Sequence, residues 1–419
     1  MRILFLSNFF PPLHRGGYEE LAADVAEALR ARGHRIDVLT SNWRAPGGAD
    51  PVVHRVLELE VDLRPWRGTL GFFAGRRRRA ENDAARLRDA IAAMRPDVLL
   101  AWGMWNLPRT LLVHAESQRR PPVVYYVADY WPALRDAYAM HWQAPATHRW
   151  ARLPKAVLAR AIYQLHRSPP PPALAFRHAI CVSHAVRARL IEAGLPFQDA
   201  RVIHNGIDLR RFPFRPHPRQ PAAGAIAIGY IGRMTPEKGV DTLLAALAVL
   251  VRRGQAVHLT LAGAADRSRA AALRRRIERL GLSDCVTLCG FVPRDRVPPL
   301  LGEVDVLVVP SLWPEPLARS IQEGMATGAA VVATPVGGTV EIVEDGVNGL
   351  LFPPADAAAL AERIERLQRD PALRASLAAA ARRTVEERFD LARTVDALED
   401  VLRHAASAAN ATNLAVEAG

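Results

Sequence analysis

The sequence predicts an α/β protein with two doubly wound domains of similar size. Apolar runs alternate with helical patterns in two successive series along the 419 residues. A proline-rich stretch without periodicity, residues 205–224, separates the series and is expected to be an interdomain linker. The expected domains are therefore 1–204 and 205–385, followed by a C-terminal helix and tail at 386–419.

The first series begins as a βαβ unit. The run RILFLS at 2–7 predicts a strand, the pattern YEELAADVAEALRARG at 18–33 predicts a helix closed by Gly33, and RIDVLT predicts the next strand. Three further apolar runs, DVLLAW, PVVYYV and HAICVS, are typical of buried parallel strands. Helical segments separate them, which favours a doubly wound sheet.

The second series predicts six more strands. Their sequences are AIAIGYIG, VHLTLAG, CVTLCG, VDVLVVP, AAVVAT and GLLF. A terminal helical pattern follows at 386–405, and the small, polar residues after 406 are expected to fray.

Composition excludes some classes and leaves others open. The chain is half apolar, with 55 Lys and Arg against 43 Asp and Glu, so it is globular and basic. A basic surface suits nucleic acid, an anionic membrane or phosphorylated substrates. The three cysteines form no CxxC pair, which is typical of a reducing compartment. We find no apolar run long enough to span a bilayer and no signal peptide, and expect a cytoplasmic protein.

The stretch PSLWPEPLARSIQEGMATGAAVVATPVGG, residues 310–338, carries two acids, Glu315 and Glu323. Pro316 suits a first helical position, so we expect a helix over 316–326 with Glu315 at its cap. The N–H groups of its first turn would form an anion site at the carboxyl end of a parallel strand. An acid at each end could accept hydroxyl hydrogen bonds, a layout that fits a nucleotide diphosphate sugar. A solvated helix with two exposed acids is the alternative.

Two cations follow another predicted strand. In GRMTPEKGVDTLLAAL, Arg233 and Lys238 lie in the loop before a helix, where they could clamp a diphosphate. Lys238 is one of only two lysines, which favours a function over a plain exposed residue. The chain has no Asp-x-Asp pair, so we do not expect a metal to hold the diphosphate. Gly337 and Gly338, and Gly17 in the first domain, could bring backbone N–H groups to a ligand, or could simply form turns.

These motifs resemble those of the retaining glycosyltransferases of family 4, also called glycosyl transferases group 1. The matching donor-domain sequences are GRMTPEKGVDTLLAA, PSLWPEPLARSIQEGMATG, VVATPVGGTVEIVEDGVNGLLF and VIHNGID. The N-terminal GGYEELAADVAEALRARGHRIDVLT is similar too, and the resemblance covers roughly residues 1–400.

The resemblance implies a GT-B fold, in which two Rossmann-like domains face a central cleft and the C-terminal helix crosses back to the N-terminal domain. Residues 1–204 would bind the acceptor and 205–385 the nucleotide sugar. A sugar would pass to a glycan, lipid-linked or small-molecule acceptor with retained configuration. The implied mechanism is front-face and needs neither a metal nor a cofactor.

The resemblance also implies residue roles. Glu315 would contact the sugar and Glu323 the ribose, and Asn205 would line the cleft. The catalytic candidates are Glu315, Arg233, Lys238 and Asp129. The donor-binding candidates are Gly17, Asn205, Arg233, Lys238, Glu315, Leu317, Ala318, Arg319, Glu323, Gly337 and Gly338.

The sequence departs from the family pattern in two places. Many members read EPFG where this chain has EPLA, beginning at Glu315. Many also carry a histidine where this chain has Ala128. Asp129 is the candidate substitute, with His14 as a second one. The alternative for Asp129 is that it caps the turn that follows it.

Two more segments allow functional and structural interpretations. The segment 68–79 ends in Arg76, Arg77, Arg78 and Arg79 and could contact an anionic membrane on its inner face, or form a solvated helix face. The aromatics Trp102, Trp105, Tyr130 and Trp131 could form an acceptor platform or pack in the core.

Competing functions are a GT-B sugar-nucleotide epimerase, a phosphorylase or a basic binding protein. No recognised nucleic-acid module appears in the sequence. The donor base and sugar, the acceptor and the linkage are not predicted.

Overall fold

The computed structural model describes residues 1–13, 16–44, 50–61, 75–118, 120–135, 140, 152–165, 173–215 and 225–417. The chain forms two compact units. Unit 1 comprises Met1–Cys181, Arg187–Val202 and Val395–Gly419, and unit 2 comprises Val182–Val186 and Ile203–Thr394. Two Rossmann-like α/β domains are therefore present, as the sequence predicts.

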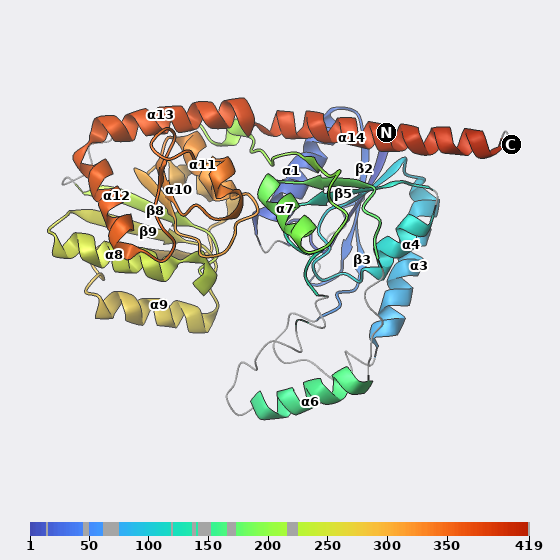
Figure 1. Ribbon diagram of the computed structural model, residues 1–419, viewed down its shortest axis with the longest axis horizontal. Helices are drawn as coiled ribbons and strands as arrows, with labels where there is room; N and C mark the ends of the chain where they lie inside the picture. Colours follow the sequence, from blue (N-terminus) through green and yellow to red (C-terminus); the bar gives the residue numbers. More distant parts are fainter. Residues whose placement is uncertain are drawn as a thin grey trace. The chain divides into compact units, whose positions relative to one another are not determined.

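Unit 1 is built on a parallel sheet with helices around it (Figure 1). The strand order is β3-β2-β1-β4-β5-β6-β7. The elements are β1 (Arg2–Ser7), α1 (Gly17–Ala31), β2 (Arg35–Ser41), β3 (Val53–Leu57), α3 (Arg76–Met94), β4 (Val98–Ala101), α4 (Thr110–Ser117), β5 (Val123–Val127), α6 (Arg152–Leu165), β6 (His178–Cys181), α7 (His184–Glu192, shared with unit 2) and β7 (Arg201–Val202). The five strands expected from apolar runs are all present. Strands β3 and β7 were not predicted, because β3 mixes polar with apolar residues and β7 is only two residues long.

Unit 2 repeats the same winding in a second parallel sheet. Its strand order is β10-β9-β8-β11-β12-β13. The elements are η2 (Leu209–Arg211), β8 (Ile226–Ile231), η4 (Pro236–Lys238), α8 (Val240–Arg252), β9 (Val257–Ala262), α9 (Arg267–Arg279), β10 (Val286–Gly290), η5 (Arg294–Arg296), α10 (Val297–Leu301), β11 (Val306–Val309), α11 (Arg319–Thr327), β12 (Ala330–Ala333), η6 (Gly337–Glu341), β13 (Leu350–Leu351), α12 (Ala357–Arg369), α13 (Pro371–Arg388) and the start of α14 (Leu391–Glu417). All six predicted strands form, each within its apolar run.

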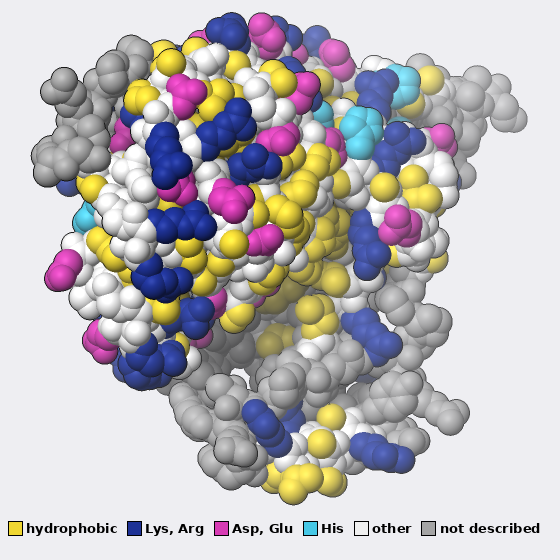
Figure 2. All heavy atoms as spheres, turned by 60° about the vertical axis from the view of Figure 1, so that its left-hand side comes forward, with side chains coloured by type: hydrophobic (Ala, Val, Ile, Leu, Met, Phe, Trp, Pro, Cys, Tyr) yellow, Lys and Arg dark blue, Asp and Glu magenta, His cyan; other side chains and the backbone are white. Residues whose placement is uncertain are grey.

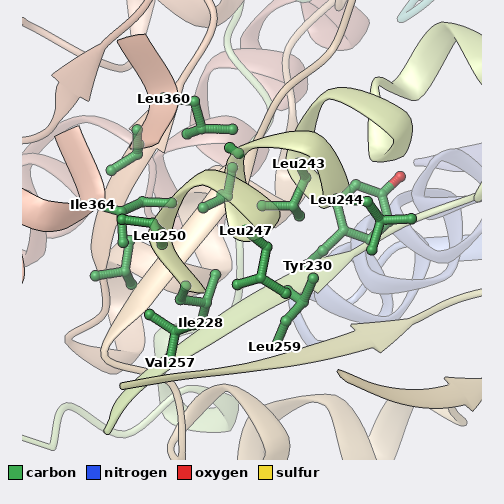
Figure 3. Close-up of a cluster of buried hydrophobic side chains, with 14 of the residues drawn as sticks. Ile228, Tyr230, Leu243, Leu244, Leu247, Leu250, Val257, Leu259, Leu360 and Ile364 are labelled. Atoms are coloured by element: carbon green, nitrogen blue, oxygen red, sulfur yellow. The ribbon is translucent and has the colours of Figure 1, made fainter. Parts of the chain in front are cut away.

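The core of unit 2 forms around α8. Its buried leucines recur every three or four residues, which places Leu243, Leu247 and Leu250 on one face. Figure 3 shows this face between the strand residues of β8 and β9 and the α12 residues Leu360 and Ile364. The carboxyl end of β8 is therefore held in place by a packed layer of helices.

Two helix predictions need correction. The helix expected to begin at Pro316 begins at Arg319, after an extended Ala318 with φ −73° and ψ 108°. Glu315 therefore lies in the preceding loop, and only Glu323 is helical. The tail after 406, expected to fray, continues as α14 to Glu417, because its sequence is rich in alanine, the strongest helix former.

Helix α14 is anchored to unit 1 by a buried carboxylate. Glu399 lies 2.9 Å from Arg32 Nη1 at the end of α1 and 2.8 Å from His34 Nε2. Burial alone would raise the pKa of Glu399, but hydrogen bonds from Arg32, His34 and Arg403 lower it to about 2. The return of the C-terminal helix to the N-terminal domain is thus confirmed.

Candidate functional site

The candidate site lies at the point in unit 2 where the strand order reverses. Strands β8 and β11 are neighbours in the sheet, and the chain winds away from them in opposite directions. In open α/β sheets, ligands bind beyond the carboxyl ends of such strands. The loops that leave these two strands are the ones carrying Arg233 with Lys238 and Glu315 with α11.

The loop after β8 is held in a tight course. The Tyr230 hydroxyl donates to the Arg233 carbonyl at 2.6 Å, which turns the chain sharply after the strand. Gly239 has φ +73°, and a Cβ there would lie 1.8 Å from the Pro310 carbonyl oxygen. Only glycine fits at this contact, so the two loops are packed backbone to backbone.

Lys238 and Glu315 join the two loops through a bidentate ion pair. The Lys238 ammonium lies 2.6 Å from Glu315 Oε1 and 2.8 Å from Oε2. Ser311 donates its hydroxyl to the same Oε1 at 2.6 Å. The Glu315 side chain is 9% exposed and that of Lys238 is 19% exposed, so the pair is largely shielded from water.

The backbone around Glu315 is fixed by the glycine pair that follows β12. The Gly338 N–H donates to the Glu315 carbonyl at 2.7 Å. A Cβ on Gly337 would lie 2.3 Å from the Glu315 carbonyl oxygen, and one on Gly338 would lie 2.1 Å from that of Pro316. These glycines allow two protein segments to meet, a structural role that the sequence did not reveal. A contact with a ligand stays a prediction.

The remaining donor-site candidates in unit 2 surround the start of α11. Leu317 and Ala318 are buried, and Arg319 is the first helical residue. Arg319 Nε lies 3.7 Å from Glu323 Oε1, one turn further on, and both side chains are mostly buried. The first-turn N–H groups that could receive an anion therefore follow Ala318 and not Glu315.

Asn205 lies beside the same helix. Its side-chain amide donates to Gln322 Oε1 at 3.2 Å, and the Gln322 amide donates to the Asn205 carbonyl at 2.7 Å. Both residues are buried. The sequence did not predict a role for Gln322. The only feature that could have indicated one was its position directly before Glu323.

Glu341, the acid three residues after Gly338 in the family-matching stretch VVATPVGGTVEIVEDGVNGLLF, has partners of its own. Its carboxylate lies 2.9 Å from His204 Nε2 and accepts the N–H groups of His184 and Ala185. Burial alone would raise the pKa of Glu341, but these hydrogen bonds lower it. The motif acid thus fixes the segment before Asn205 and the first turn of α7.

In unit 1 the predicted residues lie at the carboxyl edge of the sheet. Gly17 opens α1 after β1, and Asp129 follows β5. Asp129 Oδ1 accepts the Trp131 N–H at 2.8 Å, which is the capping contact considered as the alternative. Burial raises the pKa of Asp129 to about 6, although this hydrogen bond opposes the shift. His14 lies outside the described residues.

Tyr18 is the neighbour of Asp129 that sequence reasoning missed. Its hydroxyl is within hydrogen-bonding reach of the carbonyls of Trp102 and Tyr126, the latter at 2.9 Å. Burial, and then the Asp129 carboxylate, raise the pKa of Tyr18. The only feature of the sequence that could have indicated Tyr18 was its position directly after Gly17.

Most of the candidate acceptor-platform aromatics are buried in the protein, and one of the four arginines at 76–79 pairs with an acid of unit 1. Trp102, Tyr130 and Trp131 are buried, and Trp102 stacks on Tyr126 with ring centroids 4.1 Å apart. Trp105 is half-buried at a small hollow. Among the four arginines, Arg76 lies 2.9 Å from Glu60 Oε1, whereas Arg77 and Arg78 are exposed.

Neither a bilayer-spanning helix nor a metal-binding cluster is present among the described residues. Within the described ranges, no helix has the length and apolar character needed to cross a bilayer. The same ranges hold no cluster of three or more histidine, cysteine or acidic side chains suited to a metal ion.

Comparison with known families decides the class of protein. Residues 217–384 match the family described as Glycosyl transferases group 1, and residues 15–211 match Glycosyltransferase Family 4. The chain belongs to glycosyltransferase family 4. It is an enzyme, a glycosyltransferase, as the motifs indicated.

Relatives of this glycosyltransferase include whole-length and partial matches. A glycogen synthase of Mycobacterium tuberculosis is 27% identical over 420 residues, covering 93% of this chain and 91% of that protein. The amylovoran biosynthesis glycosyltransferase AmsK of Erwinia amylovora is 31% identical over 214 residues, covering 50% of this chain and 52% of that protein.

Solved structures share the fold of this glycosyltransferase. HepE of Anabaena, solved in complex with UDP-glucose, has a TM-score of 0.68 and 25% identity, covering 96% of this chain and 100% of that one. Sucrose-phosphate synthase of Thermosynechococcus elongatus has a TM-score of 0.71 at 22% identity, covering 97% of this chain and 99% of that one, and supports the fold alone. The GT-B fold class is thereby confirmed.

Proposed function

We propose that this glycosyltransferase takes a hexose from a UDP-hexose and transfers it, with retained anomeric configuration, to a hydroxyl of a glycan, lipid-linked or small-molecule acceptor. The observation that carries the donor half is the bidentate Lys238–Glu315 pair at the strand-order reversal of unit 2. The likeness to HepE, solved with UDP-glucose, supports a uridine donor. Residues 205–385 would bind this donor, and residues 1–204 would bind the acceptor.

Each donor-site residue has a proposed task. Arg233 and Lys238 neutralise the diphosphate, and the first-turn N–H groups of α11 add hydrogen bonds to it. Glu323 accepts hydrogen bonds from the ribose hydroxyls. Glu315 accepts hydrogen bonds from the sugar hydroxyls, with its geometry fixed by Ser311 and Gly338.

The proposed reaction is front-face and needs no enzyme nucleophile. The acceptor oxygen bonds to the anomeric carbon on the same face from which the diphosphate departs. The proton of the acceptor hydroxyl passes to the departing phosphate oxygen. Negative charge on that phosphate grows in the transition state, so the two cations and α11 contribute mainly there. Asp129 orients the acceptor hydroxyl without itself bonding to the sugar. No metal takes part.

A panel of nucleotide sugars tests this function. The purified chain is incubated with UDP-, GDP- and ADP-hexoses in the presence of a chelator, and nucleotide release is measured. Release from a UDP-hexose alone is the expected result, with water as the acceptor and the hexose from an α-linked donor appearing first as the α-anomer by NMR. Interconversion of the sugar nucleotides without transfer would instead identify an epimerase, and rescue of a chelated sample by Mg²⁺ would overturn the metal-free mechanism.

A further inference from the structure

Helix α6 of unit 1 carries large apolar side chains on its outside. Leu153 is 79% exposed, Val157 70% and Leu158 37%. Folded proteins expose single apolar residues routinely, but three within six residues of one helix form a patch that calls for a partner.

The exposed apolar residues of α6 lie on a different side of the helix from Arg152 and Lys155. At roughly 100° per residue, Leu153, Val157 and Leu158 fall within an arc of about 140°. Arg152 and Lys155 fall on the opposite side of the helix, and Arg160 lies at the edge of the arc, about 20° from Leu153. This separation is the pattern of an amphipathic surface helix.

The charge along α6 and its flanking sequence has a single sign. The helix contains three basic residues and no acid. The sequence has no Asp or Glu between Asp136 and Glu192, although it holds eight Lys and Arg there. In the lower part of Figure 2, at the level of α6 in Figure 1, yellow apolar and dark blue basic side chains appear together with no magenta acid among them.

An anionic phospholipid bilayer complements both properties at once. We propose that α6 lies in the plane of such a surface, with Leu153, Val157 and Leu158 entering the boundary between headgroups and acyl chains and Arg152, Lys155 and Arg160 contacting lipid phosphates. Interfacial helices combine a basic polar face with an apolar face in this way. A protein partner would not require so long an acid-free segment. This inference goes beyond the proposed function, because it concerns where the enzyme binds and not what it transfers.

Vesicle binding by the full chain tests the proposal without catalysis. The parent is expected to co-sediment with phosphatidylglycerol–phosphatidylcholine vesicles but not with phosphatidylcholine alone, and salt should weaken binding. The double variant Leu153→Asp/Val157→Asp should bind at least about tenfold more weakly. Val347→Asp, at an exposed valine of unit 2, is the control and should bind like the parent.

Further variants separate the contributions. Replacing Arg152, Lys155 and Arg160 by Gln should remove the preference for anionic vesicles. The separate variant Arg77→Gln/Arg78→Gln measures whether the exposed arginines of α3 also contribute to vesicle binding. Donor hydrolysis in solution should be unchanged in the α6 variants, which shows that they fold. The proposal is wrong if the parent does not bind anionic vesicles, or if the Leu153/Val157 variant binds them equally well. A parent dimer that the same variant dissociates, without vesicle binding, would make α6 a self-association surface instead.

Discussion

Lys238 holds both carboxylate oxygens of Glu315, at 2.6 and 2.8 Å, although the two residues come from different strand ends and were assigned to different parts of the donor. The pair orients the acid that is proposed to meet the sugar and keeps the cation at the place proposed for the diphosphate. Lys238 therefore has a structural partner as well as a proposed ligand.

Lys238→Ala should lower turnover by about 10²–10³, because it removes a cation opposite charge that grows in the transition state. Arg233→Ala should act in the same direction. Steady-state rates with the UDP-hexose measure this, and Arg274→Ala, at an exposed cation of α9, should behave as the parent. A normal rate in the Arg233/Lys238 double variant would remove both residues from the diphosphate site.

Glu323→Gln should weaken UDP binding by about 1.5–3 kcal/mol, the contribution of a hydrogen bond to a charged group. The sugar step should change less. Calorimetric titration with UDP gives the affinity, and Glu362→Gln, an exposed acid on α12, serves as the matched control. If UDP affinity is unchanged, Glu323 does not bind the ribose.

Gly337→Ala should weaken donor binding and stability together. Gly337 has φ +57°, and the new Cβ would meet the Glu315 carbonyl oxygen at 2.3 Å, so the Glu315 loop must shift. Gly346 provides the control, because it has a similar φ of +76° but nothing within 4 Å. Gly346→Ala should show only the backbone strain of about 1–3 kcal/mol and keep UDP affinity. Equal effects of the two substitutions would rule out the loop contact as the cause.

Asp129 should give transfer an acidic limb near pH 6, since burial raises the pKa of its carboxyl to about 6 and the ionised form is the stronger hydrogen-bond acceptor for the acceptor hydroxyl. Asp129→Asn should lose most acceptor transfer and this limb, but keep UDP affinity. Asn caps almost as well as Asp, so wild-type transfer in this variant would leave Asp129 with the Trp131 capping role alone.

The same shift predicts a stability change. Folded Asp129 holds its proton to higher pH than the unfolded chain, so its ionisation should reduce the free energy of unfolding as pH rises from about 4 to about 6. Denaturant melts across this range should show a smaller decrease for Asp129→Asn than for the parent.

Glu399→Gln should loosen α14 from unit 1. The variant loses the charged hydrogen bonds to Arg32 and His34, and a hydrogen bond to a charged group contributes about 1.5–3 kcal/mol to stability. Amide hydrogen exchange in α14 should therefore accelerate. The pKa of Glu399 is lowered from the ordinary value of 4.5 to about 2, so its stabilising effect is present above about pH 4.5 and is lost as pH falls toward 2. Exchange that is as slow as in the parent would show that other contacts hold the helix.

The sequence by itself determined the fold class, the eleven strands that form from apolar runs, and the family, because these depend on local periodicity and on motifs a few residues long. It did not determine the short strands β3 and β7, whose pairing depends on neighbours distant in the chain. It also placed the start of α11 three residues early, because Pro316 permits a helix start while the meeting of the Glu315 backbone with Gly337 and Gly338 keeps that segment extended. Only the tertiary structure paired Lys238 with Glu315 and Asn205 with Gln322, since these long-range contacts are set by the packing of whole elements and leave no periodic signal in the sequence. The local contact of Asp129 with Trp131 is, by contrast, the cap that the sequence had offered as an alternative.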